Sequence, residues 1–375
     1  MSPIFRAQAF ALGIALFGVA ACEQKKPGPD NARSEADTGT DKYAAADPKL
    51  EKALKAAAAA SSGSDTGPPP EGLFAPGAAD QRHAKGVPTK LDVVSAGGDP
   101  KISLVRAEAG PDGALTASYG PAVLEVAMQM GPRSAMPTID LSLVLGPAKK
   151  DEGGPGWLVG TVRAASPAKE QYGQLPPGIE KDIASLEGTQ LRVELMADGR
   201  ETDLRTQPGK SSQPELVRIA QSATGALAIV TVPLPPSPIG EGAQWIAETR
   251  MPWSGLDVIA YRAYRVKSIE GERVHLTMDM KAYAANSTTE LAGVPKGATL
   301  TQFNAEAHGE IELVRGEIVA RQAAMQERLM LLFSQGSSPP EPGQAGEPQR
   351  GMLTAQIQTE AKFVRGEDLR AAARR

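Results

Sequence analysis

The sequence predicts a mainly β protein built on one large antiparallel sheet, curved like half of a barrel, with two short inserted helices. Two observations lead to this fold class. From residue 89 onward, apolar and polar side chains alternate with a period of two, which is typical of strands that bury one face and expose the other. Glycine-containing turn sequences separate these strands at the spacing of hairpins.

Five segments show the alternation most clearly and are predicted to be strands: 124–130, 139–145, 191–196, 274–281 and 353–363. Hairpin tips are predicted at three turn sequences, residues 197–200, 268–272 and 314–317. The composition of residues 321–333 suits a helix, but the segment follows the turn at Gly316, which favours a strand. The alternation slips between Ala263 and Tyr264, which predicts a bulge or bend there.

Two short helices are predicted between the strands. The first has three apolar residues at the spacing of one helical face, which are Ile179, Ile183 and Leu186. The second begins at residues 212–215, Ser-Gln-Pro-Glu, which form a capping box with proline in the first turn. This second helix is expected to turn three residues inward, which are Leu216, Ile219 and Ala223. It is expected to end near Gly225.

The single cysteine of the chain, Cys22, directly follows an uninterrupted apolar run over residues 9–21. Arg6 precedes the run, and the run is shorter than the roughly 20 apolar residues that span a bilayer, so it is typical of a secretory signal peptide. Residues 19–22, Val-Ala-Ala-Cys, resemble the lipobox of bacterial lipoproteins. The resemblance implies that the signal peptide 1–21 is removed and that Cys22 is lipidated, with a diacylglyceryl group and usually an amide-linked acyl chain.

A lipidated Cys22 predicts a protein that is anchored to a membrane in the cell envelope. Each buried methylene contributes about 0.8 kcal/mol, so several acyl chains hold a protein permanently. The next residue is Glu23 and not the aspartate that retains lipoproteins at the inner membrane of enteric bacteria. This difference favours the outer membrane and leaves the leaflet open. An acylated Cys22 also leaves no thiol for a disulfide, a metal site or a nucleophile.

Composition divides the mature chain into three parts. Residues 22–88 are predicted to be a lipid-anchored disordered linker, because they are rich in Ala, Pro and Gly and poor in large apolar residues. Residues 89–366 form the β-rich domain, with a flexible loop at 334–350, and residues 367–375 form a basic C-terminal tail. The formal net charge is −4, and no Lys/Arg cluster marks a nucleic-acid surface, so nucleic acid is excluded as a partner.

Residues 234–245 (LPPSPIGEGAQW) resemble a motif of a bacterial family of secreted or lipid-anchored proteins of unknown function. The motif is a proline-rich approach, a glycine turn and a tryptophan that opens a long strand. A tyrosine-rich strand, a glycine hairpin and another strand follow it, here 259–266, Gly271 and 274–283. The resemblance extends over about residues 100–365. It implies a β-rich fold outside the cytoplasm and supplies no catalytic residues.

Three aromatic residues near this motif could face a ligand, namely Trp245, Trp253 and Tyr261. The alternative is that they pack in the core, as aromatic residues of such strands usually do. The three histidines are scattered and expected at the surface: His83 in the linker, His275 and His308. No metal-ligand spacing, hydrolase nucleophile elbow or phosphate-binding loop occurs in the sequence. It therefore predicts no metal, no cofactor and no enzyme.

Three functions remain open at this point. A curved sheet with helices in its mouth could hold an apolar ligand or lipid, by analogy with periplasmic lipid carriers, and would then contain an apolar cavity. Alternatively, the domain could be a protein–protein interaction or structural module whose partner is another envelope protein, with a solid core and an exposed apolar patch. A hydrolase with an unrecognised site would need a buried polar cluster in a cleft.

Overall fold

The structure is a computed structural model of the whole chain. It describes residues 69, 71–104, 120–130, 134–135, 137–147, 156–168, 177–196, 199–213, 216–253, 256–288, 294, 297–334 and 352–366. The signal peptide, Cys22 and the linker up to residue 68 lie outside the described residues. The same holds for the predicted loop after Ser334 and for the tail 367–375.

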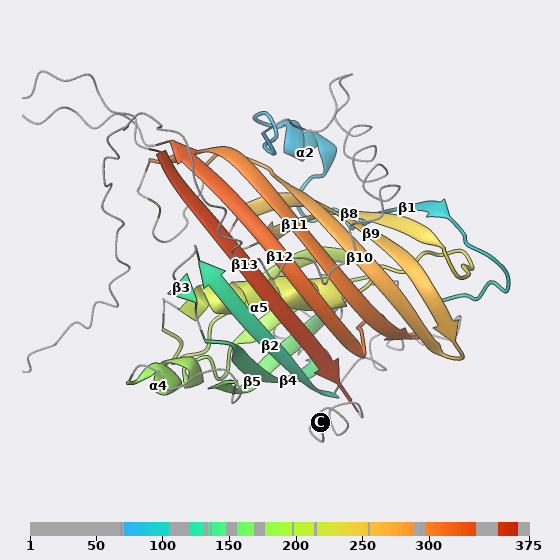
Figure 1. Cartoon of the computed structure of the whole chain (residues 1–375), viewed down its shortest axis with the longest axis horizontal. Coiled ribbons are helices and arrows are strands. Elements are labelled where there is room, and N and C mark those ends of the chain that lie inside the picture. The colour runs from blue at the N-terminus through green and yellow to red at the C-terminus, as the bar shows by residue number, and fades with distance from the viewer. Residues whose placement is uncertain are drawn as a thin grey trace, which may run out of the picture.

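Thirteen strands of the described residues form one antiparallel sheet (Figure 1). Their bounds are β1 Lys90–Ser95, β2 Gly120–Met130, β3 Ser134–Ala135, β4 Ile139–Pro147, β5 Trp157–Pro167, β6 Gln190–Leu195, β7 Glu201–Gln207, β8 Gln244–Trp253, β9 Leu256–Glu270, β10 Arg273–Ala284, β11 Thr299–Val314, β12 Gln322–Ser334 and β13 Met352–Arg365. The described helices are α2 Ala78–Arg82, α4 Ile179–Ala184 and α5 Val217–Val230. The predicted mainly β class is confirmed, with a third described helix beside the two expected ones.

The sheet consists of two runs of strands that are neighbours in both sequence and space. One run is β2, β4, β5, β6 and β7, and the other is β8 to β13. The runs meet where β13 pairs with β2, with Phe363 opposite Leu124. Strand β1 adds to β8, and the two-residue β3 pairs with β2 beside the main path. The sheet is therefore open, with β1 and β7 as its two outer strands.

The predicted hairpins and strand faces agree with this topology. The three turn sequences join β6 to β7, β9 to β10 and β11 to β12. Residues 322–334 form strand β12 and not a helix, as the preceding turn suggested. In β10 the buried residues alternate strictly with partly exposed ones from Val274 to Lys281, because this strand buries only one face there.

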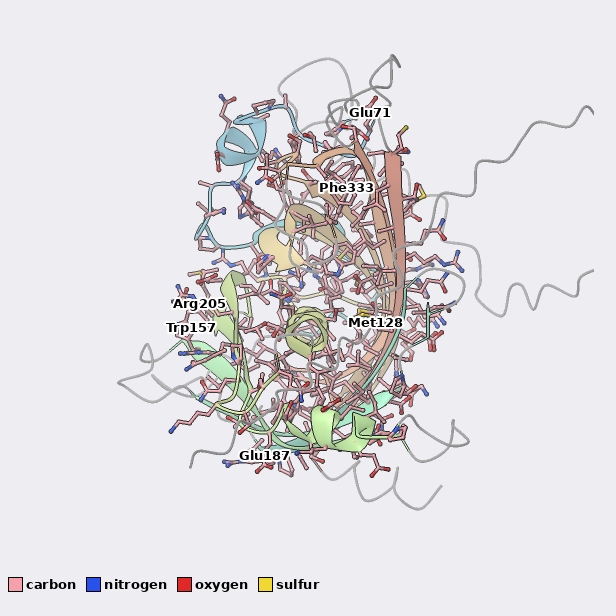
Figure 2. All side chains as sticks on the ribbon, turned by 90° about the vertical axis from the view of Figure 1, so that its left-hand side faces the viewer. Glu71, Met128, Trp157, Glu187, Arg205 and Phe333 are labelled. Atoms are coloured by element: carbon pink, nitrogen blue, oxygen red, sulfur yellow. The ribbon has the colours of Figure 1, made fainter. Side chains whose placement is uncertain are left out.

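Helix α5 connects β7 to β8 and runs through the interior of the curved sheet. Figure 2 views this helix end-on, with β5 to β7 on one side and the long strands β12 and β13 on the other. Every residue from Ser222 to Val230 is buried. A helix that is buried all round is surrounded by protein on every side. The curved sheet thus surrounds α5 and buries it.

The sequence placed both ends of α5 incorrectly. The helix does not stop near Gly225, because the buried turn after it, with Leu227 fully buried, outweighs the roughly 1 kcal/mol that glycine costs in a helix. The helix also does not start at Ser212, and Glu215 of the expected capping box lies outside the described residues. The N-cap is Leu216, and the Ser212 hydroxyl instead donates to the carbonyl oxygen of Ser185 at 3.2 Å. The Ser212 side chain therefore bonds to the end of α4 and not to α5.

Residues 71–88, which composition assigns to the linker, are folded against the sheet. Leu73 forms a parallel bridge with Ala284 of β10, and α2 lies over the face of β8 to β10 that points away from α5. A second apolar cluster forms there, which consists of Phe74, Ala79, Ile246, Ile259, Tyr261, Ala263, Tyr283 and Ala285. The sheet offers an apolar surface at this place, so a few apolar residues in a polar segment are enough to order it.

Strand β9 is buried on both faces from Val258 to Tyr264, because the 71–88 segment covers one face and the core covers the other. This double burial explains why its alternation is lost. The predicted bulge between Ala263 and Tyr264 is wrong, since the pairing of β9 with β8 continues through both residues. The register shift lies further on, where Lys267 is the extra residue opposite His275 and Leu276 of β10.

Candidate functional site on the concave face

The concave face of the sheet is the face that surrounds α5, and its side chains are mainly apolar. One row across it consists of Val266, Leu276, Ile311, Ala323, Phe363, Leu124 and Leu141, all buried except the partly buried Ala323. Helix α5 contacts β6, β7, β8, β13 and β2. A side-chain carbon added at Gly160 of β5 would lie 3.4 Å from Leu227 of α5, so the helix fills this part of the face tightly. A ligand there would have to displace α5.

Four polar residues lie buried where the two outer edges of the sheet approach each other. We name Thr89, Glu201, Thr249 and Arg262 the seam cluster. Arg262 of β9 donates two hydrogen bonds to Glu201 of β7, of 2.7 Å to Oε1 and 2.6 Å to Oε2. The backbone N–H of Thr89, just before β1, donates to the carbonyl oxygen of Glu201 at 2.9 Å. The seam cluster therefore joins the β1 edge to the β7 edge without a strand ladder.

The remaining bonds of the seam cluster connect it to the helix. Arg262 also donates to the Thr249 hydroxyl at 2.9 Å and to the carbonyl oxygen of Ala228 in α5 at 3.3 Å. The hydroxyls of Thr89 and Thr249 lie 2.7 Å apart, and Thr89 donates to the Glu201 carboxylate at 2.9 Å. Strands β7, β8 and β9, the residue before β1 and helix α5 thus meet at one buried ion pair.

Electrostatics keep the Arg262 guanidinium charged in spite of its burial. Burial alone would lower the pKa of the Arg262 guanidinium, but the attraction of Glu201 outweighs this and the pKa lies above its ordinary value. Burial raises the pKa of the neighbouring Tyr264 hydroxyl, which stays neutral. An ion pair of this kind joins structural elements, although Arg262 Nε is buried without a hydrogen-bond partner among the described residues.

A second region of the concave face extends beyond α5 and beyond β2. Strand β2 ends its pairing at Met130, opposite Ile357 of β13. Residues Met352–Gln356 of β13 continue past this point and pair with Met330–Ser334 of β12. We name these two paired segments the overhang. Figure 1 shows the upper end of β13 reaching beyond β2.

The concave side of the overhang is apolar and only partly buried. Leu353, Ala355 and Ile357 of β13 face this side and are half-buried, although they are apolar. Their neighbours on β12, Leu331 and Phe333, are fully buried. The alternation over residues 353–363 correctly predicted which side chains of β13 face the core and which face outward. It could not reveal that β2 ends opposite Ile357, because this depends on pairing between segments more than 200 residues apart.

The structure separates the three aromatic residues that the sequence selected as a ligand platform. Trp245 is fully buried on the concave face, stacks on Tyr264 with ring centroids 5.3 Å apart, and donates its ring N–H to the carbonyl oxygen of Pro233 at 3.0 Å. Trp253 lies in the same core. Tyr261 lies on the opposite face of β9, in the cluster under α2. The three residues therefore share no common surface.

Sequence reasoning missed a charged cluster that fastens the 71–88 segment. The buried carboxylate of Glu248 in β8 binds Arg82, lies 3.1 Å from His83 Nδ1 and accepts a hydrogen bond from Lys90 at 3.3 Å. Burial alone would raise the pKa of Glu248, but the bond to His83 and the charges of Arg82 and Lys90 lower it below its ordinary value. Nearby, Arg250 forms an ion pair with Asp257 at 2.8 Å.

The expected surface position of the histidines is wrong for His83, which is buried with Nε2 3.0 Å from the carbonyl oxygen of Val87. His275 and His308 lie on the convex face, where His308 Nδ1 is 2.7 Å from Asp279. The bond to Asp279 raises the pKa of His308. Within the described ranges, no group of three or more His, Cys, Asp or Glu side chains could hold a metal ion. In the same part of the chain, no helix is long and apolar enough to cross a membrane.

Comparisons with known proteins give little similarity. No protein-family model matches the chain, and no curated protein matches it. A lipovitellin chain, from a structure concerned with lipid–protein interactions in lipovitellin, aligns with a TM-score of 0.39 and 10% sequence identity. The alignment covers 66% of this chain and 25% of the lipovitellin chain, so it spans about a quarter of that protein. A similarity of this size indicates neither a family nor a function.

Proposed function

We propose that this protein is a non-catalytic lipoprotein of the bacterial cell envelope that holds an apolar ligand, such as a lipid chain, on the concave side of the overhang. The observation that carries the proposal is the half-buried state of Leu353, Ala355 and Ile357, which face inward. Elsewhere on this face α5 and neighbouring strands bury most apolar side chains, with Ile269 and Ala323 among the exceptions that are also partly buried. Burying each further methylene against such a surface contributes about 0.8 kcal/mol, so an alkyl chain would bind here favourably.

The path of the chain supports a ligand that comes from the membrane. Lipidation of Cys22 would attach the protein to the outer membrane, and the linker would lead from there to the domain. The first described residues of the domain lie near the overhang, since the N–H of Phe303 in β11 donates to the carbonyl oxygen of Glu71 at 2.9 Å. Figure 2 shows Glu71 and Phe333 of β12 at the same end of the domain. The linker would therefore enter next to the proposed ligand surface.

The ligand proposal is tested with a photoactivatable fatty acid added to the full chain in nanodiscs, followed by peptide mapping. Labelled peptides should include residues 352–357. The variant Ala355→Trp, which fills the concave side, should reduce this label several-fold, whereas Gln356→Trp on the outward side of the same strand should not. Label confined to the N-terminal peptide, or equal label in both variants, would contradict the proposal.

The anchor is tested separately by the variant Cys22→Ser. Membrane fractionation should find the unaltered chain in the outer membrane and should find the serine variant without attached lipid. The mass of the N-terminal peptide should fall by the mass of the acyl groups. Equal membrane binding of both chains, with a mass difference of only oxygen for sulfur, would reject lipidation of Cys22.

A further inference from the structure

The overhang has one edge with no described strand beside it, as well as an apolar face. On the β2 side, no described strand pairs with Met352–Gln356 of β13, so the N–H and C=O groups on this side of the strand have no ladder partner among the residues described. Unpaired edges of this kind are templates for another strand, and proteins usually protect them with charges, proline or bulges. The three edges of this sheet can therefore be compared.

The two outer edges of the sheet carry such protection. In β7 the Asp203 carboxylate accepts a hydrogen bond from the backbone N–H of Leu204 at 2.8 Å, which blocks one edge donor, and Arg205 beside it is exposed. Strand β1 has exposed charges at Lys90 and Asp92. Each of these edges would repel or misalign an added strand.

The overhang edge carries none of these devices. Its sequence, Met-Leu-Thr-Ala-Gln, has no charge and no proline, and its register with β12 is regular throughout. Apolar Leu353 and Ala355 face the concave side, and polar Thr354 and Gln356 face outward. An uncharged strand of alternating character, with no described strand beside it on one side, is suited to pairing.

We propose that this edge pairs with the same edge of a second copy of the chain, antiparallel and centred on Thr354. In this arrangement Thr354 lies opposite its own copy, Leu353 lies opposite Ala355, and Met352 lies opposite Gln356. Apolar residues meet on the concave side, and no like charges meet. In such a two-fold symmetric dimer, the edge N–H and C=O groups of each chain bond to those of the other. The proposal does not depend on a bound apolar ligand.

Cysteine cross-linking of the full chain in its membrane tests this pairing. Residues at the two-fold axis of an antiparallel pair have Cβ atoms about 4.5–5.5 Å apart, within reach of a disulfide or a short bis-maleimide. Thr354→Cys should give a covalent dimer on a non-reducing gel, whereas the unaltered chain should not. Gln358→Cys is the matched control, since it faces the same side of β13 but lies opposite Gln129 of β2.

A charge variant gives an independent measurement. Thr354→Lys would place two positive charges on the axis and should shift the native mass from dimer to monomer, whereas Gln358→Lys should leave the dimer intact. The proposal is overturned by a Thr354→Cys chain that cross-links no more than the Gln358→Cys chain, or by a monomeric unaltered chain. Cross-linking of Thr354→Cys only to a different protein would likewise overturn pairing with a second copy.

Discussion

Arg262 of β9 and Glu201 of β7 form a buried, two-bonded ion pair between strands that lie far apart along the sheet order. The sheet is open, yet this pair and Thr89 hold its two outer edges together beside the end of α5. Burying such a pair costs desolvation free energy, and well-packed apolar residues in its place often give a folded state of similar stability. Its role here is to connect three separate elements in one defined arrangement.

Breaking this ion pair should strongly destabilise the domain. In Glu201→Leu the guanidinium of Arg262 stays buried without its partner, which costs about 3–5 kcal/mol of unfolding free energy. Urea unfolding of the two chains measures the difference. Asp203→Asn on the same strand is the control and should change the free energy by less than about 0.5 kcal/mol. Combining Glu201→Leu with Arg262→Met should recover most of the loss, and a double variant as unstable as the single one would refute this explanation.

Helix α5 should behave as core and not as a removable lid. Leu227 is fully buried between α5 and the sheet, so Leu227→Ala should lower the unfolding free energy by about 2–5 kcal/mol. Gln221, a partly exposed residue of the same helix, serves as the control, and its change to alanine should be close to neutral. Equal effects of the two substitutions would mean that α5 is not enclosed by the sheet.

The charged cluster at Glu248 should hold the 71–88 segment on the sheet. Glu248→Gln weakens the contacts to Arg82, His83 and Lys90, so trypsin should cut after Arg82 and Lys85 several times faster than in the unaltered chain. Asp92→Asn, on exposed β1, should leave the cleavage rate unchanged. Since the pKa of Glu248 is lowered on folding, its contribution is present above about pH 4.3 and is lost as the pH falls through the lowered value. Cleavage of the unaltered chain that is fast at neutral pH would contradict this role.

The pair of His308 and Asp279 should make a small, pH-dependent contribution. The pKa of His308 is raised on folding, so its stabilising effect is present below about pH 6.5 and is lost as the pH rises through the raised value. The pair lies near the surface, among Asp279, Glu310 and Lys267, which limits the effect to less than about 1 kcal/mol. The difference in unfolding free energy between the unaltered chain and His308→Gln should be larger at about pH 5.5 than at about pH 8.5. A difference that grows toward alkaline pH would exclude the pair as its source.

Local patterns predicted the strands because most strands bury one face. The alternation from Val274 to Lys281 gave both the strand and its buried side, and the turn at Gly316 correctly favoured strand β12 over a helix. The same method failed where burial is two-sided. In β9 both faces are buried, because the 71–88 segment covers the outer one. Apolar residues therefore occur on both faces, and the lost alternation at Ala263 and Tyr264 resembled a bulge.

Long-range contacts were beyond sequence reasoning. The buried positions of His83 and Arg262 depend on partners more than 60 residues away, and His83 in its polar segment gave no sign of burial. The overhang exists because β2 ends opposite Ile357, and the sequence of β13 shows no change at that point. The aromatic residues were selected for their side-chain chemistry, but the fold decides on which face of the sheet each one lies. Trp245 lies in the core on the concave face, and Tyr261 lies on the opposite face.

The central claim, an apolar ligand on the concave side of the overhang, is tested most directly by a photoreactive residue built into the chain itself. Benzoylphenylalanine replaces Ala355 on the concave side or Gln356 on the outward side, and the cells are irradiated before the peptides are analysed by mass. We expect the peptide with the probe at position 355 to carry a lipid-sized adduct and the peptide with the probe at 356 to carry none. Lipid adducts at neither position, or equally at both, would contradict the account.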